Sequence, residues 1–262
     1  MMNTGLLLNS AICFAIGISS MAFAWVLLGS SKQHSDNSKP ALYSLVVFWT
    51  IVGLTYLPTS IRMLAAYFGN QEIDAILYFI SAIPFAFVAV PLAFFIIYIV
   101  VGSRKAGEYT ALFFTILGAL YLAFLYQSGI VGPAVTEWAS IFSINSDIAI
   151  HIYLIGLFVV PTSMIIGLLT LILLQRLPKR IRYRTALPLV AISFVFDFML
   201  TDVIAILDFM QIFSRLFILI GTILAYLAYF PPMTVQEKLG IQKYCVDMYT
   251  IEELEEKFDL KS

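Results

Sequence analysis

The residues best suited to chemistry lie in a long apolar segment, residues 186–207, which contains most of the run SFVFDFMLTDVIAILD. This run carries Asp197, Thr201 and Asp202, and it ends at Asp208. An ionisable side chain within a stretch apolar enough for lipid is costly to bury, and such residues commonly mark an ion path, a proton relay or a ligand site. Asp197, Thr201 and Asp202 are therefore our first candidates for a ligand, ion or proton site.

Helical geometry separates the two carboxylates of this run. Counted from residue 186, Asp197 lies about 17 Å along a helix with a rise of ~1.5 Å per residue, which is near the middle of a bilayer. Asp202 lies roughly 7 Å further along. Asp197, Thr201 and Asp208 share one helix face, whereas Asp202 is rotated by about 140° from Asp197. The two carboxylates are thus predicted not to point into the same narrow groove.

A carboxylate at this depth needs a cationic partner, a proton or hydrogen-bond donors. Asp202 matches the expected height of Arg62 and Arg215, so an Asp202–Arg62 or an Asp202–Arg215 ion pair is predicted. Asp197 has no basic residue at its own height. Its carboxylate is therefore expected to accept hydrogen bonds from hydroxyl groups, to be protonated, or to bind a cation or ligand. The alternative is a purely structural role, in which Asp197 is a neutral hydrogen-bonding group between helices.

His151 is the remaining ionisable candidate, one turn into the apolar segment 148–175. A lone histidine there is most often a packing or hydrogen-bonding residue, and pH sensing is the functional alternative. The chain has two histidines and two cysteines. Their spacing does not suggest the three or four converging ligands of a zinc site, and no nucleophile–base pair is evident. We therefore expect no metal, no cofactor and no enzymatic activity.

The composition requires lipid as the solvent for most of the chain. Of 262 residues, 61% are hydrophobic and 12% are charged, against about 45–50% and about 25% in soluble domains. A net charge of −1 argues against a nucleic-acid partner, because phosphate binding needs clustered lysine and arginine. The sequence therefore predicts a multi-pass protein of the cell membrane whose main partner is the lipid bilayer.

Seven apolar segments reach the roughly 20 residues that a membrane-spanning helix needs. We expect the first to be a retained helix and not a cleaved signal, because the opening MMNTG carries no positive charge. Backbone polar groups in lipid must bond within the segment, which favours helices. The sequence predicts an all-α seven-helix bundle over residues 1–230, with spans near 4–28, 41–67, 76–101, 110–129, 148–175, 186–207 and 213–230.

The distribution of lysine and arginine predicts the orientation of the bundle. Connectors one, three and five and the tail contain nearly all of the basic residues, whereas connectors two and four contain none. Basic connectors remain on the cytoplasmic side, so the N-terminus is expected outside and the C-terminus inside. The opposite face is acidic, which is either a solvated rim or a cation-attracting vestibule; its members are Glu72, Asp74, Glu137, Asp147 and Asp208.

Two segments outside the expected spans carry structural predictions. Connector four, residues 130–147, is apolar in part and is expected to form a short helix that lies on the membrane face or caps the bundle, with Trp138 at the interface. The cytoplasmic tail, residues 231–262, is expected to contain an amphipathic helix near 251–258. Within the spans, kinks are expected at the mid-helix prolines, because proline removes a backbone bond: Pro58, Pro84, Pro91 and Pro161.

The helix count and orientation invite comparison with seven-helix receptor families. The last span, FSRLFILIGTILAYLAYF, lacks the lysine that microbial rhodopsins use to bind retinal. It also lacks the Asn-Pro-x-x-Tyr motif of G-protein-coupled receptors, and the third span ends IVVGSRKAG without their acidic-Arg-aromatic motif. The stretch GTILAYLAYFPPMTVQEKLGI resembles the end of the seven-helix input modules of prokaryotic sensor kinases, although no kinase follows it. This resemblance implies a prokaryotic stand-alone sensor that signals through a cytoplasmic partner.

Three classes of function remain open from the sequence. The first is a receptor-like sensor that relays an extracellular or intramembrane signal to a cytoplasmic partner. The second is a transporter or ion-conducting protein that uses Asp197 at the midplane, where transport sites commonly lie. The third is a non-catalytic subunit of a larger membrane complex. We expect the sensor. A polar, ligand-sized cavity that reaches Asp197 between the helices would distinguish a sensor or transporter from a subunit, which should instead expose a flat helix face of small residues.

Overall fold

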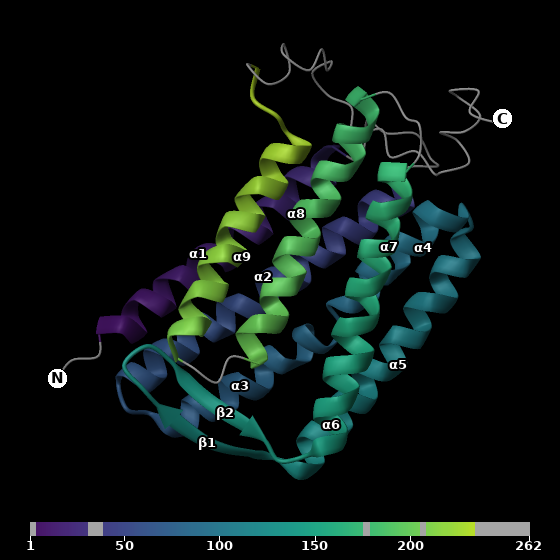
Figure 1. Ribbon diagram of the computed structural model, residues 1–262. Helices are drawn as coiled ribbons and strands as arrows, with labels where there is room; N and C mark the ends of the chain where they lie inside the picture. The colour runs from purple at the N-terminus through teal and green to yellow at the C-terminus, as the bar shows by residue number, and fades with distance from the viewer. Residues whose placement is uncertain (1–3, 31–38, 175–178, 205–207, 234–262) are drawn as a thin grey trace.

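The computed structural model describes residues 4–30, 39–174, 179–204 and 208–233, and their side chains except those of 179–187, 203, 204 and 208. The described chain is helical apart from one two-stranded β-hairpin and short connections, and Figure 1 shows the hairpin across one end of the helices. The elements are α1 (Thr4–Ser30), α2 (Lys39–Tyr67), α3 (Gln71–Ala86), α4 (Ala89–Val101), α5 (Arg104–Ser128), β1 (Ile130–Val135), β2 (Ser140–Ile144), α6 (Asp147–His151), η2 (Ile152–Val159, a π-helix), α7 (Val160–Leu174), α8 (Lys179–Ile204) and α9 (Asp208–Tyr229).

Six helical spans in the described residues are long and apolar enough to cross a membrane, judged by length and composition. They are α1, α2, α3 with α4, α5, α6 with η2 and α7, and most of α9. The remaining expected span, the sixth in chain order at 186–207, falls on α8, which begins at Lys179 and thus includes part of the basic connector before it. The helical architecture is confirmed, while the count of seven membrane spans stays a prediction.

The first two helices pack closely against each other. A Cβ on Gly17 would lie 2.7 Å from the side chain of Leu57, so only glycine fits there without a shift. The Ser10 hydroxyl donates to the Ser60 carbonyl at 2.9 Å, and the Ser60 hydroxyl donates to the Ser10 carbonyl at 2.9 Å. Small residues and interhelical hydroxyl bonds of this kind are typical of helix pairs in lipid.

The third span is interrupted between α3 and α4, where prolines were expected to distort it. Pro91 has no N–H to donate to the Phe87 carbonyl, which accepts instead from Val90 at 3.1 Å. The Phe87 N–H in turn bonds the Pro84 carbonyl at 3.0 Å. The helix therefore tightens and restarts at this point, so the kink predicted for the two prolines is confirmed. Pro58, by contrast, lies inside the continuous helix α2.

The fifth span contains a π-helical stretch, η2, immediately before Pro161. The Val160 N–H bonds the Ile155 carbonyl, five residues back. Because Pro161 cannot donate to the carbonyl four residues before it, a local change of hydrogen-bond register accommodates the proline. The Ser163 hydroxyl donates to the Val159 carbonyl at 2.8 Å, as expected for hydroxyls that follow a proline in a membrane helix.

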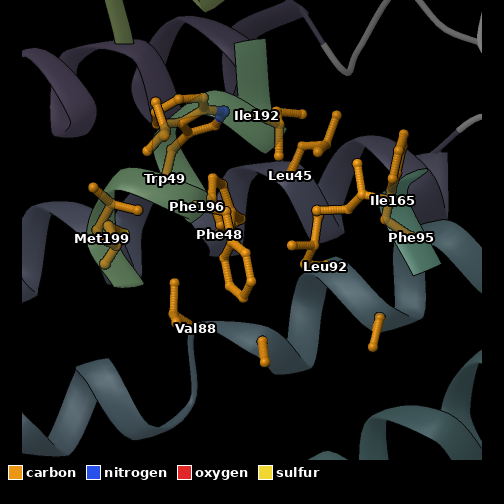
Figure 2. Packing of buried hydrophobic residues seen from close by; sticks show 14 of the residues in the cluster. Leu45, Phe48, Trp49, Val88, Leu92, Phe95, Ile165, Ile192, Phe196 and Met199 are labelled. Atoms are coloured by element: carbon orange, nitrogen blue, oxygen red, sulfur yellow. The ribbon is translucent and has the colours of Figure 1, made fainter. Parts of the chain in front are cut away.

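The hydrophobic core contains residues from all of the described helices, and part of it lies between α2, α4, α7 and α8. Figure 2 shows buried side chains of these four helices directed toward a common centre. Those from α2 are Leu45, Phe48 and Trp49, each with no exposed surface. This part of the core brings together segments that lie far apart in the sequence, and it includes α8, on which both candidate aspartates lie.

The outward faces of the helices remain strongly apolar. On α5, the side chains of Leu112, Phe113 and Ile116 are each more than half exposed. Trp25 on α1 is 78% exposed. Water-soluble monomers rarely present contiguous apolar surfaces of this extent.

Connector four forms a β-hairpin and not the capping helix expected from its apolar residues. Pro133 lacks a donor and Gly132 has a φ of 125°, and neither feature is compatible with a helix. The turn is closed by the Thr136 N–H, which bonds the Ala139 carbonyl at 2.8 Å. The strands run antiparallel, with Ile130 opposite Ile144, Val131 opposite Ser143, Ala134 opposite Ile141 and Val135 opposite Ser140.

The last described helix stops where the prolines predicted. The Phe230 N–H still bonds the Tyr226 carbonyl at 2.8 Å, and Pro231 and Pro232 follow, which cannot continue the backbone ladder. The amphipathic helix expected near 251–258 lies outside the described residues, as does nearly all of the tail.

Candidate ligand-binding site

A cavity of about 480 Å³ lies between the hairpin and the helices at that end of the bundle. Residues of α2, α3, α5, η2, α8 and α9 form its walls, and β2 closes it. Its apolar lining includes Phe85, Phe142 and Leu154. Its polar lining residues are Thr55, Tyr56, Thr59, Arg62, Tyr78, Ser81, Tyr121, Ser140, Ser143, Tyr153, Asp202, Gln211 and Arg215.

Arg215 and Asp202 form a buried ion pair on one side of the cavity. Arg215 Nε donates to both carboxylate oxygens of Asp202, at 2.9 and 3.2 Å. Its Nη1 donates to Asn9 Oδ1 at 2.7 Å, and the Tyr56 hydroxyl donates to Asp202 at 3.3 Å. This cluster joins α1, α2, α8 and α9, and it is one of the two pairs expected from the heights of the residues in the sequence.

Arg62 pairs with Asp74, so the predicted Asp202–Arg62 ion pair is wrong. Arg62 Nε lies 2.9 Å from Asp74 Oδ1. Its Nη2 donates to the Ser140 carbonyl, and the Ser140 hydroxyl donates to Asp74. Asp74 is fully buried, so it is not a member of an exposed acidic rim. The nearest carboxylate to Arg62 belongs to the following helix, because α2 and α3 meet at a tight turn.

Two aromatic rings lie against the Arg62 guanidinium. Its central carbon lies 5.2 Å from the centroid of the Tyr78 ring and 5.3 Å from that of Phe142. A guanidinium at this distance is attracted to the electron-rich ring faces. Arg62 thus ties α2 and α3 to β2. The hairpin is held over the cavity by the hydrogen bonds of Ser140 to Arg62 and Asp74 and by the contact of the Phe142 ring with Arg62.

Tyr153 contributes a buried hydroxyl that borders the cavity. Tyr153 is 2% exposed, and its hydroxyl has no hydrogen-bond partner among the described residues. Its ring packs on Phe85 and Tyr121, with centroids 5.3 and 5.4 Å away. A buried hydroxyl without a partner costs about 1–3 kcal/mol. A polar group of a ligand in the cavity can accept a hydrogen bond from the Tyr153 hydroxyl or donate one to it.

The cavity does not reach Asp197, which corrects the expectation for a sensor or transporter. Asp197 is not among the residues that line it and lies among hydroxyl groups. The Thr162 hydroxyl donates to Asp197 Oδ1 at 3.0 Å, and the Ser193 hydroxyl donates to Oδ2 at 3.1 Å. The Thr201 hydroxyl donates to the Asp197 backbone carbonyl at 3.1 Å. Of the alternatives for Asp197, stabilisation by hydroxyls is the one that the structure contains. Asp202, on the other face of α8, is the aspartate that lines the cavity.

The remaining predicted residues do not join the site. His151 is exposed, and its Nδ1 lies 2.6 Å from the carbonyl oxygen of Asp147 on its own helix. It is not among the described residues that line the cavity. The side chain of Asp208 lies outside the described part of the chain. Within that part, no group of three or more His, Cys, Asp or Glu residues is arranged to hold a metal ion.

Sequence reasoning missed several polar residues that line the cavity, and it missed Asn9, which does not line the cavity but accepts a hydrogen bond from the lining residue Arg215. Asn9 is a polar residue in the first apolar span, and Gln211 lies one helical turn before Arg215, so each carried a recognisable signal. Gln211 Oε1 accepts from Arg215 Nη2 at 3.5 Å. Tyr153 and Ser140 carried no such signal, because tyrosine and serine occur throughout the chain.

Comparison with protein-family models, with curated proteins and with solved structures finds no match to this chain. The class of this protein therefore follows from its fold and its site alone. It is a helical protein with six described spans of membrane-crossing length and a polar cavity under a β-hairpin.

Proposed function

We propose that this protein is a receptor-like sensor of the cell membrane, with seven spanning helices, the hairpin end outside and the tail in the cytoplasm. In this proposal a small ligand enters the cavity under the hairpin, and its binding is relayed to a cytoplasmic partner. The observation that carries the proposal is the cavity of about 480 Å³ lined by the charged side chains of Arg62, Asp202 and Arg215. Buried charges in a membrane segment are costly, and they are expected where they serve a function.

Placement in the membrane is supported by the surface and by the distribution of charge. The exposed apolar side chains of α5 and the other outer faces suit an apolar solvent. At the end away from the hairpin, α5 begins with Arg104 and Lys105, and α8 begins with the basic stretch 179–184. Basic connectors are retained in the cytoplasm, so the cavity would open toward the outside.

The size and lining of the cavity indicate the kind of ligand. Sites for small molecules commonly have volumes of about 300–1,000 Å³ and mix apolar walls with a few polar groups. The walls here include the rings of Tyr78, Tyr121 and Tyr153, and the polar groups include Gln211. The charged groups are paired within the protein. A small organic molecule with an apolar or aromatic body and hydrogen-bonding substituents fits this lining.

A relay route runs through α8 and α9. Arg215 and Gln211 lie on α9, which leads directly into the tail, and Asp202 lies on α8. A ligand group that bonds Asp202 or Arg215 would compete with their mutual contact. Small shifts at such an ion pair become shifts of whole helices, because packed helices move as units. Movement of α9 would then reach the cytoplasmic partner.

The transport alternative has weaker support. It depends on Asp197, which is bonded by Thr162 and Ser193 and does not line the cavity. Under the sensor proposal, Asp197→Asn leaves ligand binding in the cavity unchanged. Loss of ligand binding in this variant, with normal folding, would favour an Asp197-centred mechanism instead.

A thermal-shift screen of the purified protein in detergent tests the proposal. The probes are a panel of amino acids, nucleosides, sugars and small aromatic acids, amines and alcohols. A cavity ligand should raise the Tm of the natural protein and not that of Ala82→Phe, in which the added ring fills the cavity that Ala82 lines. Ala119→Phe, on the exposed face of α5, is the matched control and should keep the response.

The two outcomes separate clearly. A compound that stabilises the natural protein and the Ala119→Phe variant, but not Ala82→Phe, supports the cavity as a ligand site. If every stabilising compound acts equally on all three proteins, or none stabilises any of them, the proposal is wrong. Tyr153→Phe is a second probe, because removal of one hydroxyl should weaken binding of the same compound while the fold is retained.

A further inference from the structure

A second, larger depression lies on the side of the bundle, between α2, α4 and α5, with a volume of about 780 Å³. Its walls are mostly apolar, from residues such as Val47 and Ile51 of α2 and Val90 and Phe94 of α4. The residues of α2 that line it extend from Lys39 to Ile51, a distance of roughly 18 Å along a helix. The depression is thus a long groove and not a compact cavity.

The groove is basic at one end. Lys39 and Arg104 line it there, and each is the first residue of its helix, α2 and α5 respectively. The N-terminus of a helix carries a partial positive charge that favours anions. Figure 1 shows the connection between α4 and α5 at the end of the bundle away from the hairpin. An apolar groove therefore leads to a cluster of positive charge at the end proposed to face the cytoplasm.

Glu108 is the one acidic residue among those that line the groove. It pairs with Arg104, with Oε1 and Nε 2.8 Å apart, and both side chains are more than half exposed. An exposed pair at i and i+4 contributes only about 0.3–0.5 kcal/mol. Such a pair is readily exchanged, so Arg104 can bond an incoming phosphate instead.

We propose that this groove binds one anionic phospholipid, with its phosphate at Lys39 and Arg104 and an acyl chain along the apolar walls. Basic pockets between membrane helices on the cytoplasmic side bind anionic headgroups in this way. Charge complementarity selects the anionic lipid over a zwitterionic one, and the apolar length selects a lipid over a free phosphate. The inference depends on the membrane placement proposed above but not on the ligand cavity.

Native mass spectrometry of the full chain in detergent micelles tests this site. The probes are palmitoyl-oleoyl-phosphatidylglycerol and palmitoyl-oleoyl-phosphatidylcholine, titrated separately, with the affinity of the first bound lipid as the readout. The natural protein should prefer phosphatidylglycerol. Lys39→Gln and Arg104→Gln should each reduce that preference about fivefold, the effect expected of one cation near a lipid headgroup, while Glu108→Gln should increase it.

Two controls keep the test decisive. Lys105→Gln removes a neighbouring exposed cation that does not line the groove, and it should leave the preference unchanged. Val47→Trp fills the groove from a position that is 48% exposed, and it should abolish first-site binding of both lipids with an unchanged Tm. If Lys39→Gln and Arg104→Gln behave like Lys105→Gln, or if Val47→Trp binds lipid normally, the site is refuted. The cavity variant Ala82→Phe should bind phosphatidylglycerol normally.

Discussion

Arg62 and Asp74 form a buried ion pair, with Nε and Oδ1 2.9 Å apart, across the turn between α2 and α3. Ser140 of the hairpin bonds both residues, with its carbonyl accepting from Arg62 and its hydroxyl donating to Asp74. One arginine therefore fixes two helices and the strand that closes the cavity. The hairpin's position depends on this contact more than on its own two-stranded pairing, since isolated hairpins are only marginally stable.

Replacement of Arg62 by lysine should loosen the hairpin. Lysine keeps the charge but lacks the planar fork that reaches Asp74 and the Ser140 carbonyl together. Hydrogen–deuterium exchange should rise in residues 130–144 while α1 and α2 keep their protection. A Lys105→Arg variant, at an exposed site on α5, serves as the control. Equal protection of the hairpin in the Arg62→Lys variant would contradict the role assigned to the fork.

Removal of one charge from the Asp202–Arg215 pair should destabilise the protein much more than removal of both charges. Asp202→Asn leaves the Arg215 charge without its counter-ion, and we expect a loss of about 3–5 kcal/mol in the free energy of unfolding. The double variant Asp202→Leu with Arg215→Met removes both charges and should recover most of that loss. Unfolding followed by circular dichroism in detergent provides the measurement.

The exposed pair of Arg104 and Glu108 is the internal comparison for that experiment. Their atoms are 2.8 Å apart, against 2.9 Å in the Asp202–Arg215 pair, yet Glu108→Gln should change the free energy of unfolding by only about 0.5 kcal/mol. Equal losses for the two sites would show that burial does not determine the strength of the Asp202–Arg215 contact.

Gly118 should not tolerate a larger residue. A Cβ at this position would lie 2.6 Å from the Ala86 carbonyl oxygen at the end of α3, and a backbone atom cannot move aside cheaply. Gly118→Ala is expected to destabilise the protein by roughly 1–3 kcal/mol. Gly167→Ala is the matched control, because no atom lies within 4 Å of its added Cβ and alanine favours a helix by about 1 kcal/mol over glycine. Thermal melts of the two variants should therefore shift in opposite directions.

Labelling of single cysteines tests the proposed orientation. In a background without Cys13 and Cys245, Val131→Cys places a thiol on the exposed face of the hairpin, and Lys105→Cys places one at the opposite end of the bundle. A membrane-impermeant maleimide added to intact cells should label Val131→Cys, and it should label Lys105→Cys only after the membrane is permeabilised. The reverse pattern would place the cavity on the cytoplasmic side.

Local features of the sequence were enough for the helical architecture. Continuous apolar runs predicted the spans, because backbone groups in an apolar solvent can bond only within their own helix. Pro84 and Pro91 predicted the interruption between α3 and α4, because each removes a donor from a known position. The match in height between Asp202 and Arg215 also predicted a contact, since the rise of a helix is regular. These inferences needed only the geometry of single helices.

The hairpin and the composition of the cavity required the tertiary structure. Residues 130–144 are apolar enough to suggest a helix, and their strand pairing depends on Gly132 and Pro133 together with the docking of Ser140 on Arg62 and Asp74. The sequence also left open whether Arg62 pairs with Asp202.

The apolar segments and the positions of the charged residues in the sequence were enough to predict the long helices and the height of each charge along them. Only the tertiary structure decided which charges meet, because that depends on the rotation of each helix about its axis. For α8, packing against α9 and α7 sets this rotation. This packing turns Asp202 toward Arg215 and the cavity, and it leaves Asp197 to the hydroxyls of Thr162 and Ser193.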